Sequence, residues 1–506
     1  MIKAFKTNQM NLKTVLFMLL LVIPISLITG FITALGVKQL DMLWIAALGG
    51  VALLALSNAT LIWGVAVMAL LVVGQAMYFA GFNQAVWIPY GLGMLFFLRM
   101  PMVYANSPFS RLSISPPLVF PVLIFIGAVI LSMLINTSQP FQAFRAAKSY
   151  IFLWSVFLLI AYFGVKLDTL NKLWRFCILV VFIQLPLVLY QYLFVASKRS
   201  NLGGLHGVSW DAIVGGFGGD PMGGGASGTM AWFLVFTSVL CVALYRRNLI
   251  SKWLLAGALV ISAICIGLAE VKVVVLLLPL GMAAIFAPYL KKNPFKVMLA
   301  LLVSVLVAFG VLVLYGFLRS KTGSFDLDII EILNDAFWYS LDPNNINFVT
   351  GEMGRVASFV HWWQENGFNN PLHTLFGHGP GSSSSSGVFG VGEVARKYSF
   401  DINRSTLSIF LWDIGLIGVL SYLFIIFKGL SLALKASKLI NLEPFQAAVS
   451  EAIFGGLLMV LVMLPYGKDV TEVPALGVLL MFFLGYVSQS VSQHKITAKT
   501  KSDYAY

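Results

Sequence analysis

Long apolar runs recur along almost the whole chain, and they constrain its fold more than any other feature. Each run is about 20 residues long, which is the length that an α-helix needs to cross the hydrocarbon core of a bilayer. Only 10% of the residues are charged, whereas soluble domains carry roughly 25% charged residues. Transmembrane β-strands would instead give short segments of alternating polarity. The sequence therefore predicts an all-α, polytopic integral membrane protein.

The apolar runs predict about 14 transmembrane helices by length and continuity. Their predicted starts lie near residues 14, 41, 59, 83, 117, 149, 173, 227, 253, 270, 297, 405, 446 and 472. The first run follows several lysines, but it is longer than the roughly 7–15 apolar residues of a signal peptide, so we interpret it as a retained span. We expect eleven spans in 1–318, a large loop subdomain in 319–404, three spans in 405–490 and a basic tail in 491–506.

Lysine and arginine gather in alternate connections between these runs, as cytoplasmic loops do under the positive-inside rule. This pattern accounts for the net charge of +13 without a nucleic-acid partner. It predicts that both termini are cytoplasmic and that three segments face outward, namely 136–150, 197–228 and 319–403. The predicted cytoplasmic basic residues are Arg99, Arg111, Lys166, Lys172, Arg175, Arg246, Arg247, Lys252, Lys291, Lys292, Lys296, Lys428, Lys435, Lys438, Lys495, Lys499 and Lys501.

Several basic residues depart from this rule because they fall on the predicted outer side. Each of them could snorkel at the membrane interface. Lys272, however, has apolar sequence on both sides and Glu270 two residues away, and ionisable residues at such depth mark functional paths. Cations that converge on the outer side predict an anionic ligand, such as a pyrophosphate-linked lipid. The outer cations are Arg145, Lys148, Lys198, Arg199, Lys272, Arg355 and Arg404.

Two segments rich in glycine also lie on the predicted outer side. One runs from Ala212 to Met230 and contains Asp220, and the other runs from Leu372 to Gly390 and includes five consecutive serines. Glycine permits positive φ and a close approach of the backbone, which suits loops around polar headgroups or sugars. A flexible re-entrant turn fits such a pattern equally well.

The sequence "MGRVASFVHWWQENGFNNPLHTLFGHGPGSS", followed by "RSTLSIFLWDIGLIGVLSYLFIIF", resembles the signature end of the O-antigen polymerase and O-antigen ligase superfamily. Upstream, Ile213 to Gly218 resembles another motif of that family, and Lys272 stands where many members have arginine. The resemblance covers roughly residues 120–430. Its matching positions in the signature end are Gly354-Arg355, Trp362 or Trp363, Gly377-His378-Gly379-Pro380-Gly381 and Asp413-Ile414-Gly415-Leu416-Ile417-Gly418.

The resemblance implies a GT-C-like membrane glycosyltransferase in the bacterial inner membrane, with its active site on the periplasmic face. The donor would be an oligosaccharide on undecaprenyl pyrophosphate, and the acceptor a second lipid-linked repeat unit of an O-antigen, capsule or exopolysaccharide. Membrane lipids and a chain-length regulator are the further partners that it implies. No cluster of His and Cys in the sequence suggests a metal site, so we expect no cofactor and metal-independent transfer.

The resemblance and the outer charges together assign the site. Arginine and lysine can stabilise the charge that develops on a leaving pyrophosphate. A general base for the acceptor hydroxyl is less defined, and we consider His378, Asp401, Glu393 and His361. We expect catalytic roles for Arg355, Arg404, Lys272 and His378, and substrate binding by Arg145, Lys148, Glu270, Asp220, Gly377, Gly379 and Gly381. The glycine turn from Gly377 to Gly381, with its serines, is interpreted as a mobile flap over this site.

One departure from the family separates two alternatives. Ligases carry a His-Asn pair about eleven residues before the Gly-Leu-Ile-Gly glycine, and this chain has Arg404 and Ser405 there. An arginine cannot act as a base at neutral pH, which favours a polymerase over a ligase-type transferase. A flippase or another transporter is an alternative of a different class, although the sequence shows no internal repeat of the kind common in transporters. A scaffolding membrane protein is a third reading.

Overall fold

The computed structural model describes residues 56–105, 115–136, 140–196, 212–219, 221, 226–287, 293–322, 338–349, 351–384, 391–439 and 443–503. Contacts divide the chain into two compact units, Met1–Leu61 and Ile62–Tyr506. The described part of the first unit is 56–61, where helix α3 (Asn58–Val67) begins. The predicted spans near residues 14 and 41 and the site residue Asp220 lie outside the described residues.

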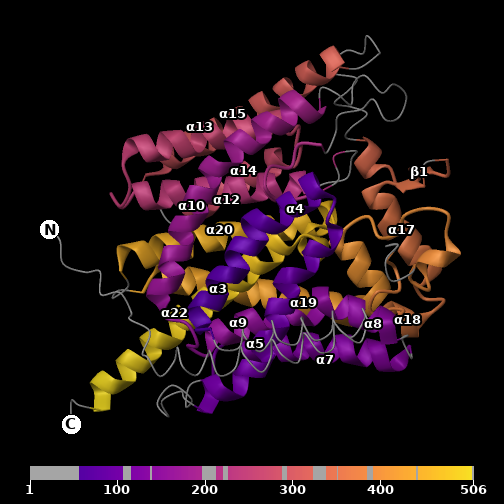
Figure 1. Ribbon diagram of the computed structural model, residues 1–506, viewed down its shortest axis with the longest axis horizontal. Helices are drawn as coiled ribbons and strands as arrows, with labels where there is room; N and C mark the ends of the chain where they lie inside the picture. The colour runs from indigo at the N-terminus through magenta and orange to yellow at the C-terminus, as the bar shows by residue number, and fades with distance from the viewer. Residues whose placement is uncertain are drawn as a thin grey trace, which may run out of the picture. The chain divides into compact units, whose positions relative to one another are not determined.

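The second unit contains the remaining described helices (Figure 1), which begin close to the predicted span starts from residue 83 onward. Seven helical segments of the described residues are long and apolar enough to cross a bilayer, and four shorter apolar helices accompany them. The chain is therefore an all-α, multi-pass membrane protein. The principal helical elements are η1 (Met68–Val72), α4 (Val73–Ala80), α5 (Trp87–Ala105), α7 (Val119–Ile135), α8 (Pro140–Ala147), η3 (Lys148–Phe152), α9 (Trp154–Ala161), α10 (Leu167–Tyr190), η4 (Gln191–Ala196), α12 (Ser227–Tyr245), α13 (Lys252–Leu268), α14 (Val274–Phe286), α15 (Pro294–Thr322), α19 (Thr406–Ser437), α20 (Pro444–Tyr466) and α22 (Pro474–Asp503).

The helices differ in what their apolar side chains face. Helices α12 and α22 are the most enclosed, with 94% of their apolar windows buried within the protein. Helix α15 instead exposes a row of large apolar side chains, including Phe295, Met298 and Leu302. A helix that is apolar all round needs either a protein core or lipid around it. In a bilayer the exposed row on α15 therefore faces lipid.

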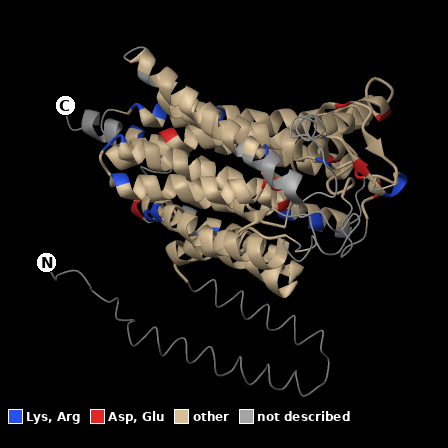
Figure 2. Cartoon of the chain, turned by 90° about the horizontal axis from the view of Figure 1, so that it is seen from above, with Lys and Arg blue, Asp and Glu red and all other residues tan. Residues whose placement is uncertain are grey.

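Charged residues gather toward the two ends of the helices and leave the middle apolar (Figure 2). At one end, Arg247 after α12 forms a two-pronged ion pair with Glu451 of α20, with N–O distances of 2.7 and 2.9 Å. At the same end, the Tyr486 hydroxyl of α22 donates to Asn171 Oδ1 at 2.9 Å. Arg247 belongs to the set of basic residues that the sequence predicts to be cytoplasmic. These contacts join the ends of helices that are far apart in sequence.

The described part of the large loop packs onto the opposite end of the helices. It contains α17 (Arg355–Glu365), α18 (Pro371–Phe376), the short helix η8 (Ala395–Lys397) and a two-stranded hairpin of β1 (Ile346–Asn347) and β2 (Glu352–Met353). Both α17 and α18 contact α19, and the indole Nε1 of Trp362 donates to the Leu411 carbonyl at 3.0 Å. Helix α15 continues to Thr322, a few residues past the predicted start of the loop. The sequence did not predict the hairpin.

Candidate functional site

Arg355 lies where the large loop meets the end of a membrane helix. It is the first residue of α17, after Gly354, whose extended backbone leads into the helix. Its Nε donates to the carbonyl of Tyr466, the last residue of α20, and its guanidinium carbon lies 4.2 Å from the centre of the Tyr466 ring. Its Nη1 donates to Ser340 Oγ at 2.6 Å. The guanidinium is thus held at the level where α20 ends.

Arg404 reaches the same region from the other end of the loop. Its Nη2 donates to the Tyr339 hydroxyl at 2.6 Å. Burial raises the pKa of the Tyr339 phenol, and the positive charges of Arg404 and Arg355 oppose that rise. Both arginines therefore act on one phenol. Within the described part of the chain, neither arginine forms an ion pair. Two half-buried cations that share one phenol and lack a carboxylate partner are suited to an anionic ligand.

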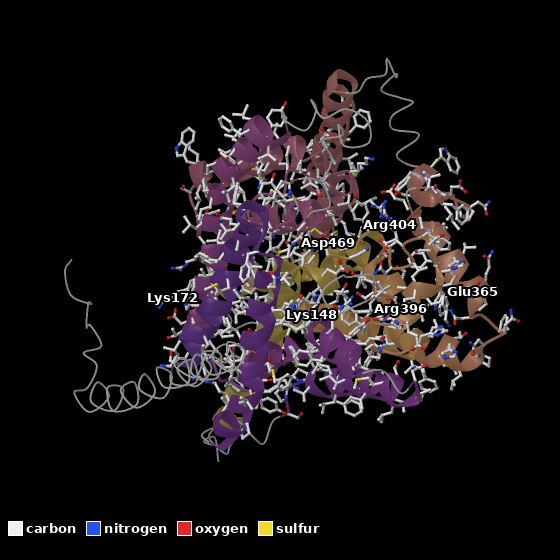
Figure 3. The ribbon with its side chains drawn as sticks, turned by 45° about the vertical axis from the view of Figure 1, so that its right-hand side comes forward. Lys148, Lys172, Glu365, Arg396, Arg404 and Asp469 are labelled. Atoms are coloured by element: carbon white, nitrogen blue, oxygen red, sulfur yellow. The ribbon has the colours of Figure 1, made fainter. Side chains whose placement is uncertain are left out.

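A pocket of about 410 Å³ adjoins Arg404 and is formed by the loop. Asp401 lines it, and its Oδ2 lies 3.1 Å from Nζ of Lys468. The same Nζ donates to Asn403 Oδ1 at 2.9 Å, which ties the loop to the turn after α20. Figure 3 shows Arg404 with Arg396 and Glu365 in the part of the molecule that the loop forms, away from Lys172. The polar and charged lining residues are Glu352, Ser383, Tyr398, Ser399, Asp401 and Arg404.

Asp413 of α19 holds the glycine turn that the sequence singles out. Its carboxylate Oδ2 accepts from the backbone of Gly381 at 2.7 Å and from the Tyr150 hydroxyl at 2.9 Å. Its Oδ1 accepts from the Ser383 backbone at 2.9 Å and from Ser382 Oγ at 3.2 Å. The turn is buried at Ser382 and Ser383. The prediction of a mobile flap is therefore wrong for 377–384, because this turn is a packed part of the framework; residues 385–390 lie outside the described residues.

Gly377 and Gly415 make this packing possible. Both have positive φ, +71° and +64°, which costs little only for glycine. A Cβ on Gly415 would lie 2.5 Å from the Gly377 nitrogen, and a Cβ on Gly377 would overlap the backbone of Asp413. Gly415 also interrupts the helical backbone of α19 with a kink. Two motifs that are distant in sequence are thus in direct backbone contact. Gly377, Gly379 and Gly381 shape this framework turn, and their predicted role in substrate binding stays a prediction.

His378 is placed inside the loop framework. Its Nε2 lies 2.8 Å from Asn366 Oδ1, and its ring stacks on His373 with 4.1 Å between centroids. Burial, followed by the charges of His373 and Lys397, lowers the pKa of His378 to about 3. Burial likewise lowers the pKa of His361, whose ring packs against Tyr398. A base is most effective when its pKa lies near the working pH, so we leave His378 out of the mechanism proposed below.

Arg145 and Lys148 lie in a separate group with acidic neighbours. Arg145 is only 7% exposed, and both side chains lie within electrostatic reach of Glu472. Nζ of Lys148 lies 5.2 Å from the centre of the Trp87 ring and 5.8 Å from that of Tyr90. These contacts offset the two charges from within the protein.

Lys272 and Glu270 lie in the tight turn between α13 and α14, as the sequence predicts. Glu270 adopts a positive φ of 55° in this turn, and Lys272 is half-buried. The structure therefore places this turn as predicted.

The described residues 212–219 of the upstream glycine segment form a turn that is mostly buried. Gln191 Oε1 accepts the backbone N–H groups of Val214 and Gly215 at 2.9 and 2.8 Å, and Gln184 Oε1 accepts that of Gly216 at 2.7 Å. Both glutamines are fully buried. Backbone amides inside a membrane protein need such partners, because lipid offers none.

Several residues of the site were not predicted from the sequence. Tyr339, Tyr466 and Lys468 all contact the two arginines or the pocket. Tyr466 and Lys468 flank the turn before the short helix α21 (Asp469–Glu472), about 110 residues beyond Arg355. A lysine at the outer end of a span is a signal that the positive-inside rule could have flagged. The tyrosines carry no comparable signal.

Among the described residues, no group of three or more His, Cys, Asp and Glu side chains is placed to hold a metal ion. The three cysteines are buried singly in helices. No model of a known protein family matches the chain. No curated protein matches it either.

Proposed function

We propose that this chain is a polysaccharide polymerase of the inner bacterial membrane. It transfers a glycan from undecaprenyl pyrophosphate to a second lipid-linked repeat unit at the periplasmic face. The observation that carries the proposal is the pair of arginines, Arg355 and Arg404, whose charges act on the same Tyr339 phenol and which form no ion pair with a carboxylate among the described residues. The resemblance described above supports the same conclusion.

The chemistry follows from where the two guanidinium groups lie. A lipid pyrophosphate sits at the headgroup level, and Arg355 is held against the last residue of a membrane helix. When the bond from the anomeric carbon to the pyrophosphate breaks, negative charge develops on the leaving oxygens. Preorganised cations stabilise that charge most in a site with little water, and arginine can bind two phosphate oxygens at once. We propose that Arg355 and Arg404 supply this stabilisation, and the resemblance implies Lys272 as a further cation of the site.

The proposal includes a topology of about 14 spans, a GT-C-like arrangement, cytoplasmic termini and a periplasmic large loop. Val349 is 94% exposed in that loop, and Lys438 follows α19 at the other end of the helices. The native cysteines are buried and give little background. In cells with a permeabilised outer membrane, we expect an impermeant maleimide to label Val349→Cys and not Lys438→Cys. Labelling of Lys438→Cys without lysis of the inner membrane would reverse the orientation and remove the site from the periplasm.

Arg404 favours a polymerase over a ligase-type transferase. It stands where the family's ligases have the histidine thought to activate the acceptor, and its guanidinium donates to Tyr339 instead. An arginine with a pKa above about 12 cannot accept the acceptor's proton. We therefore expect a strain that lacks this protein to accumulate single lipid-linked repeat units.

Gel analysis of the undecaprenyl-linked glycans in that strain tests the proposal. Single repeats support a polymerase, because elongation has failed while repeat synthesis and export continue. Long lipid-linked chains in the same pool would show that polymerisation proceeds without this protein, as a ligase predicts. Repeats trapped on the cytoplasmic face would instead indicate a flippase. A plasmid copy of the wild-type chain serves as the control and is expected to restore the polymer.

A further inference from the structure

The pocket beside Arg404 is lined by residues of the loop alone. All its lining residues come from the loop between Gly351 and Arg404, whereas Arg355 is bonded to the end of α20. Arg404 is shared, because it lines the pocket and also donates to Tyr339. A ligand in the pocket would thus lie beside Arg404 of the proposed pyrophosphate site.

The pocket has the composition of a site for a neutral polyol. It holds two carboxylates, Glu352 and Asp401, together with the hydroxyl-bearing residues Ser383, Ser399 and Tyr398. Carboxylates and hydroxyls can bind sugar hydroxyl groups by accepting and donating hydrogen bonds. Its volume of about 410 Å³ lies toward the lower end of the roughly 300–1,000 Å³ of small-molecule pockets. The space suits one or two sugar rings and not a whole oligosaccharide.

Asp401 is the better held of the two carboxylates. Nζ of Lys468 binds one of its oxygens at 3.1 Å, and its backbone N–H donates to the Gly351 carbonyl at 2.9 Å. Lys468 is itself fixed by Asn403 Oδ1. Glu352, in contrast, is exposed, and its carboxylate lies 3.5 Å from the Tyr339 hydroxyl. A base acts efficiently only when it is positioned before the reaction begins.

We propose that this pocket binds the terminal sugar of the acceptor and that Asp401 is the general base that activates its hydroxyl. This inference rests on the proposed polymerase function. Lys468 is a positioning residue, because it holds one oxygen of Asp401 and thereby fixes the carboxylate at the pocket. Asp401 thereby supplies the basic group that the histidine provides in the family's ligases and that Arg404 cannot replace.

The step balances with the groups already named. The acceptor hydroxyl gives its proton to the Asp401 carboxylate as its oxygen attacks the anomeric carbon of the donor. The new bond forms as the bond from that carbon to the pyrophosphate oxygen breaks, and the electron pair leaves with the pyrophosphate. Arg355 and Arg404 stabilise the resulting charge. A single displacement of this kind inverts the configuration at the anomeric carbon.

Purified full-length protein in detergent micelles, supplied with its lipid-linked repeat unit, tests the assignment. General-base catalysis contributes about 10²–10⁴-fold, so Asp401→Asn is expected to lower kcat by roughly 100-fold or more. Binding of undecaprenyl pyrophosphate alone, measured by titration, should stay within about two-fold of wild type. Formate added to Asp401→Gly should restore part of the rate, because a small carboxylate can occupy the vacated position. A residue that is merely structural would not be rescued in this way.

Two other carboxylates of the loop serve as comparisons. Glu352→Gln is expected to raise KM for the acceptor while kcat changes by only a few-fold, since Glu352 binds sugar without taking the proton. Glu393 is exposed and is not a lining residue of the pocket, so Glu393→Gln should behave as wild type. A wild-type kcat in Asp401→Asn, or the large loss of kcat in Glu352→Gln instead, would overturn the assignment. Wild-type protein that binds the donor and makes no polymer would overturn the proposed function itself.

Discussion

Arg355→Ala is expected to abolish long-chain glycan while the protein folds and inserts normally. The guanidinium is aimed at the position where we place the leaving pyrophosphate, and loss of one such preorganised donor costs about 10²–10³ in kcat. Arg355→Lys should recover little of the activity. A lysine keeps the charge, but it cannot keep the Tyr466 carbonyl contact, the Ser340 contact and a two-pronged bond to phosphate together.

The measurement is polymer length on a gel, normalised to the amount of membrane-inserted protein. Arg396→Ala is the matched control, because Arg396 is an exposed arginine of the same loop and does not belong to the pair of Arg355 and Arg404. It should leave the polymer unchanged. Polymer of wild-type amount and length from Arg355→Ala would move the catalytic centre elsewhere and end the present proposal.

Asp413→Leu is expected to detach the loop from the helices and to reduce the amount of folded protein. The carboxylate accepts four hydrogen bonds, from Gly381, Ser383, Ser382 and Tyr150. Leucine leaves all four donors in a buried place without a partner, at about 1–3 kcal/mol for each. The loss of roughly 4 kcal/mol or more is a large part of the stability of a typical protein.

Thermal unfolding of the detergent-solubilised protein checks this expectation. The fraction that stays folded at each temperature is measured by size-exclusion chromatography. Asp168→Leu is the comparison, since Asp168 forms an exposed ion pair with Lys172 at the opposite end of the helices. Such surface pairs contribute about 0–1 kcal/mol, so its melting temperature should change little. Equal melting of Asp413→Leu and wild type would show that the turn does not depend on this carboxylate. Arg355→Ala, in contrast, is expected to melt near the wild type.

The structure gives the two arginines and the glycine turn of the predicted site different surroundings. The charges of Arg355 and Arg404 both act on the Tyr339 phenol, and their joint catalytic role stays a prediction. The glycine turn was interpreted as a flap from its glycine and serine content. In the structure, the turn from Gly377 to Ser383 is buried against α19, because Asp413 satisfies its amides. Composition alone does not reveal whether glycine serves mobility or close packing.

The sequence by itself determined the class of fold, the approximate positions of the described spans and the end of the helices at which the cations gather. These follow from local quantities, since the length of an apolar run and the charge beside it need no tertiary contact to act on the bilayer. The tertiary structure decided which polar groups meet. Lys468 reaches Asp401 across 67 residues, and Arg355 reaches Tyr466 across 111. Such pairs depend on how the helix ends and the loop pack together, and no local pattern in the chain encodes that packing.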